Sequence, residues 1–231
     1  MTIFSVAVHI TLTFIMNFVN SHRYVLILLL AACSSGVSDI EGNEYRTVRI
    51  GDQTWMAENL RTTRFRDGTP IPQVPADAEW AALRSGAWAS YDNNALNIAL
   101  YGILYNGFAA SDARGVCPDG WKLPSASDWS ALIDHLGGDS EAGGKLKSTG
   151  TDRWTKPNAA ATDQAGFGAL PGGYRFRNGM FDHLASGGYW WSATAPTDSS
   201  LAYRALHYDY ADALIGSAPL TTGYSIRCVM E

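Results

Sequence analysis

The chain has 231 residues, a formal net charge of −5 and only 17% charged residues. Nucleic-acid binding requires a basic surface, so this mildly acidic composition leads us to expect no nucleic-acid partner. The chain also holds 8 Trp, 11 Tyr and 23 Gly, a composition typical of short aromatic strands separated by turns and unlike that of a helical bundle.

A short apolar run followed by a cysteine lies near the N-terminus. Arg23 precedes the run YVLILLL, and the small-residue site LAAC ends at Cys33. A positive start, a short apolar stretch and a small-residue site make up a signal peptide, and a cysteine directly after that site is typical of a bacterial lipoprotein. We therefore predict a signal peptide over residues 1–32, lipidation of Cys33 and attachment to a membrane through the lipid anchor.

Two alternatives concern this leader. A transmembrane anchor would need roughly 20 apolar residues, more than the run before Cys33 supplies. Met16 opens a complete signal peptide by itself, so we expect translation to start there, with a genuine extra hydrophobic segment over residues 1–15 as the alternative. Because Ser34 rather than Asp follows the cysteine, the expected location is the cell envelope, at the outer membrane, facing the surface or the periplasm.

The segment after Cys33 is small, polar and acidic. Its sequence SSGVSDIEGN has no periodic apolar pattern, which predicts a flexible lipidated tether over residues 33–44. The remaining residues 45–231 are enough for a single domain with a sizeable core.

The first half of this domain contains few helical patterns. Alternation from Tyr45 to Ile50 before a Gly51-Asp52 turn predicts a β-hairpin, residues 78–83 predict a short helical turn, and residues 101–110 predict a strand. Ser125 or Ser127 can cap a helix near Asp128, in which Trp129, Leu132, Ile133 and Leu136 recur at helical spacing. Residues 141–148 predict a second short helix that two glycines weaken.

The rest of the chain, from residue 167 onward, is predicted to form mostly antiparallel strands. Cys117 and Cys228 are the two cysteines left after Cys33. In an oxidising compartment they should pair. A metal-binding or catalytic cysteine pair is the alternative, but neither has a CxxC neighbour or a nearby histidine.

Four passages together carry a family resemblance. They are TVRIGDQTWMAENL, YGILYNGFAASDARGVCPDGWKLPSASDW, YWWSATA and GYSIRCVM. From Tyr45 to Glu231 the chain resembles the Fibrobacter succinogenes major paralogous domain family. The resemblance implies an α+β, C-type-lectin-like domain with mixed or antiparallel sheets, one or two short helices and many loops. It also places Cys117 beside an early helix and Cys228 on the final strand, as a pair.

This sequence departs from sugar-binding lectins at their calcium site. Their Glu-Pro-Asn or Gln-Pro-Asp and Trp-Asn-Asp motifs are absent. Asp92, Asn93 and Asn94 offer oxygen ligands and are weak calcium candidates, although such a run is more often a turn. No cofactor is therefore predicted. The fold also includes formylglycine-generating enzymes, whose thiol pair has no counterpart if the two cysteines form a bridge.

Aromatic residues are the ligand-binding candidates, because flat rings stack on sugars and anchor protein interfaces. Strand alternation puts Trp190 and Trp191 on opposite faces, so at least one of them belongs to the core. His135, His183 and His207 match no catalytic motif and are expected to be structural or on the surface. The candidates in the sheet region are Tyr189, Trp190, Trp191, Tyr208 and Tyr210.

The sequence thus predicts a non-catalytic envelope lipoprotein whose domain binds or adheres to an extracellular polysaccharide or protein. The alternative is a structural envelope component that assembles with outer-membrane partners. An enzyme acting on glycans, or one related to the formylglycine-generating enzymes, is a third hypothesis, since two carboxylates near in space would suffice for glycoside hydrolysis.

Overall fold

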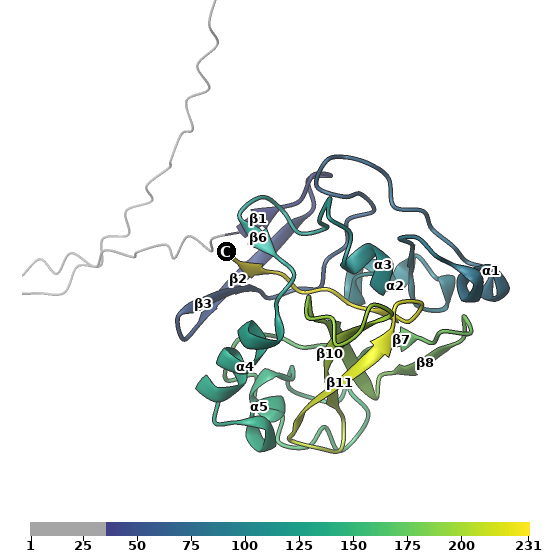
Figure 1. Cartoon of the computed structure of the whole chain (residues 1–231). Helices are drawn as coiled ribbons and strands as arrows, with labels where there is room; N and C mark the ends of the chain where they lie inside the picture. The colour runs from purple at the N-terminus through teal and green to yellow at the C-terminus, as the bar shows by residue number, and fades with distance from the viewer. Residues whose placement is uncertain (1–35) are drawn as a thin grey trace, which may run out of the picture. The chain divides into compact units, whose positions relative to one another are not determined.

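Two β-sheets and five short α-helices organise residues 36–231, which are the residues that the computed structural model describes (Figure 1). The strands are β1 (Gly36–Ser38), β2 (Glu44–Ile50), β3 (Gln53–Met56), β4 (Trp88–Ala89), β5 (Leu104–Asn106), β6 (Trp121–Lys122), β7 (Gly172–Arg175), β8 (Phe181–Leu184), β9 (Gly187–Trp191), β10 (Ser200–His207), β11 (Ala213–Pro219), β12 (Gly223–Tyr224) and β13 (Val229–Met230). The helices are α1 (Asp77–Ala82), the 3-10 turn η1 (Tyr91–Asn93), α2 (Leu96–Tyr101), α3 (Gly107–Ala110), α4 (Ala126–His135) and α5 (Asp139–Leu146). The predicted signal peptide and Cys33 lie outside the described residues.

The strands form one five-stranded and one eight-stranded sheet. The orders are β1-β2-β3-β13-β6 and β11-β10-β9-β7-β12-β5-β4, with β8 paired to β7. Named strands pair antiparallel except β7 with β9, which are parallel. The last strand, β13, pairs with β3 and β6, so the chain returns to the start of the domain. The predicted α+β class with mixed sheets and short helices is confirmed.

Both predicted helices of the middle region are present. A capping box starts α4: Ser125 Oγ accepts from the backbone N–H of Asp128, whose carboxylate accepts from the backbone N–H of Ser125. The glycines of α5 have a packing reason. A Cβ on Gly143 would lie 2.2 Å from the carbonyl oxygen of Asp212, so only glycine lets the helix approach the chain just before β11 so closely.

The predicted strand over residues 101–110 is wrong at both ends, since Tyr101 still belongs to α2. Only Leu104–Asn106 is extended, and α3 begins directly afterwards. The side chain of Asn106 accepts from the backbone N–H of Ala109 and caps this helix. A short polar cap therefore overrides the aromatic pattern that favoured a continuous strand.

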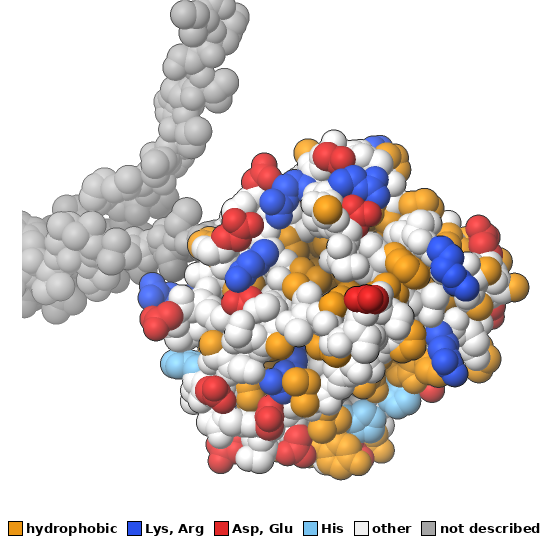
Figure 2. Space-filling view, viewed as in Figure 1, with side chains coloured by type: hydrophobic (Ala, Val, Ile, Leu, Met, Phe, Trp, Pro, Cys, Tyr) orange, Lys and Arg blue, Asp and Glu red, His pale blue; other side chains and the backbone are white. Residues whose placement is uncertain are grey.

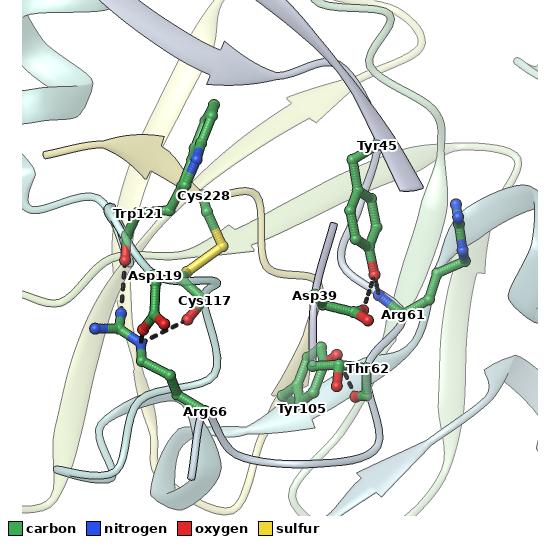
Figure 3. The surroundings of a disulfide bond; sticks show 10 residues. All are labelled: Asp39, Tyr45, Arg61, Thr62, Arg66, Tyr105, Cys117, Asp119, Trp121 and Cys228. Carbon is green, nitrogen blue, oxygen red and sulfur yellow. Dashed lines mark hydrogen bonds and ion pairs between the residues drawn. A yellow bond between two sulfur atoms is a disulfide. The ribbon is translucent and has the colours of Figure 1, made fainter. Parts of the chain in front are cut away.

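The flexible tether predicted over residues 33–44 is also wrong for its described part. Gly36–Ser38 pair antiparallel with β2. The Asp39 carboxylate accepts hydrogen bonds from the backbone N–H and the side-chain amide of Asn43. It also accepts a hydrogen bond of 2.6 Å from the hydroxyl of Tyr45 (Figure 3). That hydroxyl in turn accepts from the backbone N–H of Arg61. The Asp39 carboxylate thus provides hydrogen-bond acceptors for the polar groups of this turn. For this reason a polar, acidic segment is ordered as part of the domain.

The predicted disulfide joins Cys117 to Cys228, with their Cα atoms 6.0 Å apart (Figure 3). Both cysteines are buried. Arg66 braces the loop around Cys117 by donating to the carbonyl oxygens of Cys117 and Trp121. The bond therefore links the region before α4 to the residue directly before the last strand, next to the position that the family resemblance implied for Cys228.

The eight-stranded sheet is covered on both faces near β9. Trp191 packs in one core cluster with Tyr105 and Tyr224, whereas Trp190 packs in the other with Trp129 of α4. The two tryptophans thus face opposite sides, as strand alternation predicts. Within residues 36–231, no helix combines the length and apolarity needed to cross a bilayer.

Candidate functional site

A run of partly exposed aromatic rings crosses one face of the eight-stranded sheet. It is formed on β7, β8, β9 and the end of β10, and we call it the ring strip. In Figure 2, histidine side chains lie beside hydrophobic ones at the lower right, in the same region as β7 and β8 in Figure 1. The ring strip consists of Tyr174, Phe176, His183, Tyr189, His207 and Tyr210.

The rings of the strip contact one another in sequence. Ring centroids lie 6.3 Å apart for Phe176 and Tyr174, 5.2 Å for Tyr174 and His183, 5.8 Å for His183 and His207, and 5.5 Å for His207 and Tyr210. Phe176 and Tyr210, at the two ends, are 42% and 48% exposed. The strip is therefore an extended surface rather than a closed pocket.

Strand register explains why these rings share a face. Tyr174 and Tyr189 are side by side because β7 pairs parallel with β9 at Gly173 and Gly188. Their ring centroids are 4.9 Å apart in an edge-to-face arrangement. A Cβ on Gly187 would lie 2.8 Å from the Tyr189 ring, so this glycine lets the ring lie against its own strand.

Buried aromatic side chains support the strip from below. Tyr224 stacks on Tyr189 at 5.3 Å and contacts Tyr174 at 5.9 Å, and Trp191 lies against Tyr224 at 4.6 Å. Burial raises the pKa of Tyr174, Tyr189 and Tyr224 above the ordinary value, so these hydroxyls stay protonated at neutral pH. Tyr174 and Tyr189 are thus fixed by packing in the free protein.

Each histidine of the strip has an aspartate beside it. Nδ1 of His183 lies 3.3 Å from a carboxylate oxygen of Asp182, and Nδ1 of His207 makes a short contact with Asp209. His183 also has a left-handed backbone, with φ of 64°, which interrupts the strand alternation next to Asp182. A non-glycine residue in this region costs about 1–3 kcal/mol, and such strain concentrates at functional sites.

A buried lysine holds the loop that carries the far end of the strip. The ammonium of Lys147 donates to the carbonyl oxygens of His207 and Tyr210, at 2.8 and 2.7 Å. Its side chain is fully buried beside Trp154. Burial lowers the pKa of Lys147 to about 8, and nearby Asp209 opposes this shift.

Because Lys147 is buried, we expect the free energy of unfolding of the domain to depend on pH in a distinctive way. Its pKa is lower in the folded chain than in the unfolded chain, so between about pH 8 and pH 10.4 the unfolded chain binds more protons and stability rises with pH. Relative to Lys147→Met, the free energy of unfolding of the unmodified domain should increase by at most about 3 kcal/mol across that window. Urea denaturation of both proteins measures this, because the tyrosine contributions cancel in the difference. A difference that stays constant with pH would contradict the assignment.

The predicted binding residues fall into two groups. Tyr189 and Tyr210 belong to the ring strip, and Tyr208 lies beside it, 4.9 Å from the ring of His207. Trp190 and Trp191 are fully buried, so neither ring is available to a surface ligand, and the prediction is wrong for both. Trp191 and Trp190 fill the two core clusters instead.

Sequence reasoning missed Tyr174, Phe176, His183 and His207 as site residues. Tyr174 and Phe176 are two apart in GGYRF, so both point to one face, and this alternation was a usable signal. The histidines lie on separate strands and come together only through the pairing of the sheet. No local pattern could have revealed that contact.

The calcium candidates lie on η1 and the turn after it. Asp92 and Asn93 have positive φ values of 53° and 54°. The Asn93 amide donates to the carbonyl of Pro75, and the Asn94 side chain accepts from the backbone N–H of Leu96. The Asn94 side chain thus serves the turn itself, whereas Asn93 ties the turn to the segment before α1. Residues 36–231 contain no group of three His, Cys, Asp or Glu placed to hold a metal.

A buried hydrogen-bond network lies on the Trp190 face of the eight-stranded sheet. Arg227 donates from Nε and Nη2 to the side-chain oxygen of Asn59, at 3.2 and 2.9 Å, and from Nη1 to the carbonyl of Phe167. Trp190 Nε1 donates to the same Asn59 oxygen, and burial lowers the pKa of Arg227 to about 9. Asn59, Trp190 and Arg227 are buried and come from the distant passages WMAENL, YWWSATA and GYSIRCVM, so their hydrogen bonds hold these parts of the fold together.

Two cavities of the described chain lie away from the ring strip. One of about 420 Å³ lies beside the disulfide, between Arg66 and Lys122. The other, of about 350 Å³, lies over Asn59 and Arg227. Aromatic rings line neither, so the ring strip is the aromatic surface that an extended ligand could meet.

Comparison with known proteins identifies the family. The family model described as the Fibrobacter succinogenes major domain matches residues 48–230. Because this range covers most of the chain, the protein belongs to the Fibrobacter succinogenes major domain family, as its motifs predicted. No curated protein and no solved structure matches the chain significantly. Similarity to C-type-lectin-like domains stays a prediction.

Proposed function

We propose that this protein is a cell-envelope lipoprotein, anchored through Cys33, whose domain binds an extracytoplasmic polysaccharide without catalysis. The observation that carries the proposal is the ring strip. Its rings are partly exposed and contact one another in sequence, and Tyr174 and Tyr189 among them pack on buried Tyr224. A preformed row of rings binds without the entropic cost of ordering side chains.

The chemistry of the strip favours sugars. Aromatic faces stack on the apolar faces of sugar rings, while carboxylates accept hydrogen bonds from sugar hydroxyls. Asp182 and Asp209 lie directly beside the histidines of the strip. An open row suits a chain-like ligand better than a small molecule, which needs a concave pocket. We therefore favour an extended polysaccharide over a protein ligand.

Two features support a non-catalytic role. Cys117 and Cys228 are bonded to each other, so the described residues offer no free thiol. Neither histidine of the strip forms a hydrogen bond with a serine or threonine hydroxyl that could act as a nucleophile. The ring strip is therefore suited to holding a ligand rather than transforming it.

The anchor is tested on the protein isolated from cell membranes. We expect the N-terminal peptide to begin at Cys33 and to carry the mass of attached acyl chains. A Cys33→Ala protein should lose membrane attachment while its domain stays folded. An unmodified Cys33 in the native protein would contradict the anchor without bearing on the ring strip.

Removing the exposed end rings is expected to weaken polysaccharide binding. Phe176→Ala combined with Tyr210→Ala should raise the Kd at least tenfold, because each substitution deletes an exposed ring, and tenfold corresponds to about 1.4 kcal/mol. Affinity electrophoresis against a panel of soluble polysaccharides measures this. Ile215→Ala is the matched control, because Ile215 is 61% exposed on β11 and lies outside the strip. An equal loss of polysaccharide affinity in the control and in the double variant would contradict the assignment of the ring strip as the binding surface.

One feature favours the second candidate function, a structural envelope component. β11 is the edge of the eight-stranded sheet, carries no charged residue and exposes Leu214 and Ile215. Such an edge is suited to pairing with a strand of another protein. Co-purification of an outer-membrane partner at constant stoichiometry, lost in Ile215→Lys, would favour this function over polysaccharide binding.

A further inference from the structure

The fold begins almost immediately after the predicted lipidation site. Gly36 is already paired with Arg46 in the sheet, and Val37 with Tyr45. The next turn is closed by the Asp39 carboxylate, with its hydrogen bonds to Asn43 and Tyr45. The segment expected to act as a spacer therefore belongs to the domain.

This leaves a very short connection to the lipid. Cys33 precedes Gly36 by three residues, and three residues span at most about 11 Å even when fully extended. That limit holds for any conformation of the connection. A flexible linker of a dozen residues would instead have a root-mean-square end-to-end distance of about 20 Å.

We infer that the edge of the domain formed by β1 and the turn after it lies against the lipid headgroups; this rests on the proposed anchoring through Cys33. The partner of this surface is the bilayer itself. Ile40, at the tip of that turn, is 56% exposed and is the large apolar side chain of this edge. It is thus available to the interfacial region of the membrane.

Four charged side chains near this edge form two ion pairs. Arg46 pairs with Glu58 at 2.7 Å and Arg64 with Glu41 at 3.7 Å. Paired charges add little attraction to anionic lipids, because the field of each group is cancelled by its neighbour. The short connection, rather than electrostatics, therefore sets the height of the domain above the bilayer.

The ring strip lies at the other side of the domain. β1 and β8 are on opposite sides of the molecule in Figure 1, and β8 carries His183 of the strip. An anchor at β1 thus leaves the ring strip facing away from the lipid. This orientation would present the strip to a polysaccharide outside the membrane.

The test attaches the domain to a supported bilayer through residue 33. Both core clusters and the disulfide lie within the compact unit 34–231, so residues 33–231 contain a complete folding unit in which Cys33 is the thiol outside the disulfide. Coupling that thiol to a maleimide lipid makes the test independent of lipidation in cells. Neutron reflectometry then measures the water layer between headgroups and protein.

We expect a water layer thinner than about 11 Å for this protein, unchanged at high salt. The control inserts a Gly/Ser segment of about 20 residues between Ser35 and Gly36, and its layer should widen toward about 25 Å. Layers of equal thickness in the two proteins would overturn the inference. Polysaccharide binding is measured separately, on residues 36–231 in solution, so failure of the one result is distinguishable from failure of the other.

Discussion

Replacing Asn59 with alanine is expected to lower the free energy of unfolding of the domain by about 3–5 kcal/mol. The Asn59 oxygen accepts from Trp190 Nε1 at 2.8 Å and from two nitrogens of Arg227. Its amide donates to the carbonyl of Tyr101 at 2.8 Å. Without this side chain, a fully buried guanidinium keeps only the carbonyl of Phe167 as a hydrogen-bond partner.

Urea denaturation of residues 36–231 measures this loss. Asn178→Ala is the matched control, because Asn178 is exposed and its side chain accepts only from the backbone N–H of Met180 in a turn. The control should lose less than about 1 kcal/mol. If both variants lose the same unfolding free energy, the hydrogen-bond network of Asn59, Trp190 and Arg227 does not hold the fold together as described.

Removing the disulfide is expected to cost about 4 kcal/mol of unfolding free energy in Cys117→Ala combined with Cys228→Ala. The bond spans 111 residues, so in the unfolded chain it restricts a long loop. It also joins the loop before β6 to the residue directly before β13, next to the backbone pairing of these two strands. Reduction of the unmodified domain should produce the same loss.

Comparison of oxidised, reduced and double-alanine proteins by urea denaturation checks the prediction. The double variant should be insensitive to reductant, which serves as the internal control. An oxidised domain no more stable than the reduced one would mean that the bond adds strain equal to its entropic benefit.

Local patterns predicted the regular elements of this fold well. The helix at α4 followed from Ser125 and the spacing of Trp129, Leu132 and Ile133, because a cap and an amphipathic period are both local. The hairpin of β2 and β3 followed in the same way from alternation and the Gly51 turn. The pairing of Cys117 with Cys228 followed from their being the two cysteines left after Cys33 in an oxidising compartment, and the family resemblance supported it independently.

Specific side-chain and packing contacts, which residue patterns do not show, account for what was wrong. The acidic segment 36–44 has the composition of a linker, but Asp39 finds its partners in Asn43 and Tyr45 and the segment pairs with β2. Trp190 and Trp191 were correctly placed on opposite faces, yet both faces of the sheet are covered. Burial on two sides depends on how α4 and the second sheet pack, which a strand pattern does not encode.

The candidate site also combines residues that the sequence predicted with residues that only the folded structure reveals. Tyr189 and Tyr210 could be proposed from aromatic density in the C-terminal third. His183 lies on β8 and His207 ends β10, with β9 between them in the sequence, and their rings come within 5.8 Å only in the folded sheet. The ring strip as a continuous surface is therefore a product of strand register, visible in the structure and not in the sequence.

The most direct test of the ring strip is a side-chain chemical-shift titration of residues 36–231 with soluble polysaccharide fragments. We predict that a binding fragment shifts the ring signals of Tyr174, Phe176, His183, His207 and Tyr210, and leaves those of buried Trp129 and Trp154 unchanged. Shifts centred on the cavity over Asn59 and Arg227 instead, or no shifts with any fragment of a broad panel, would contradict polysaccharide binding by the strip.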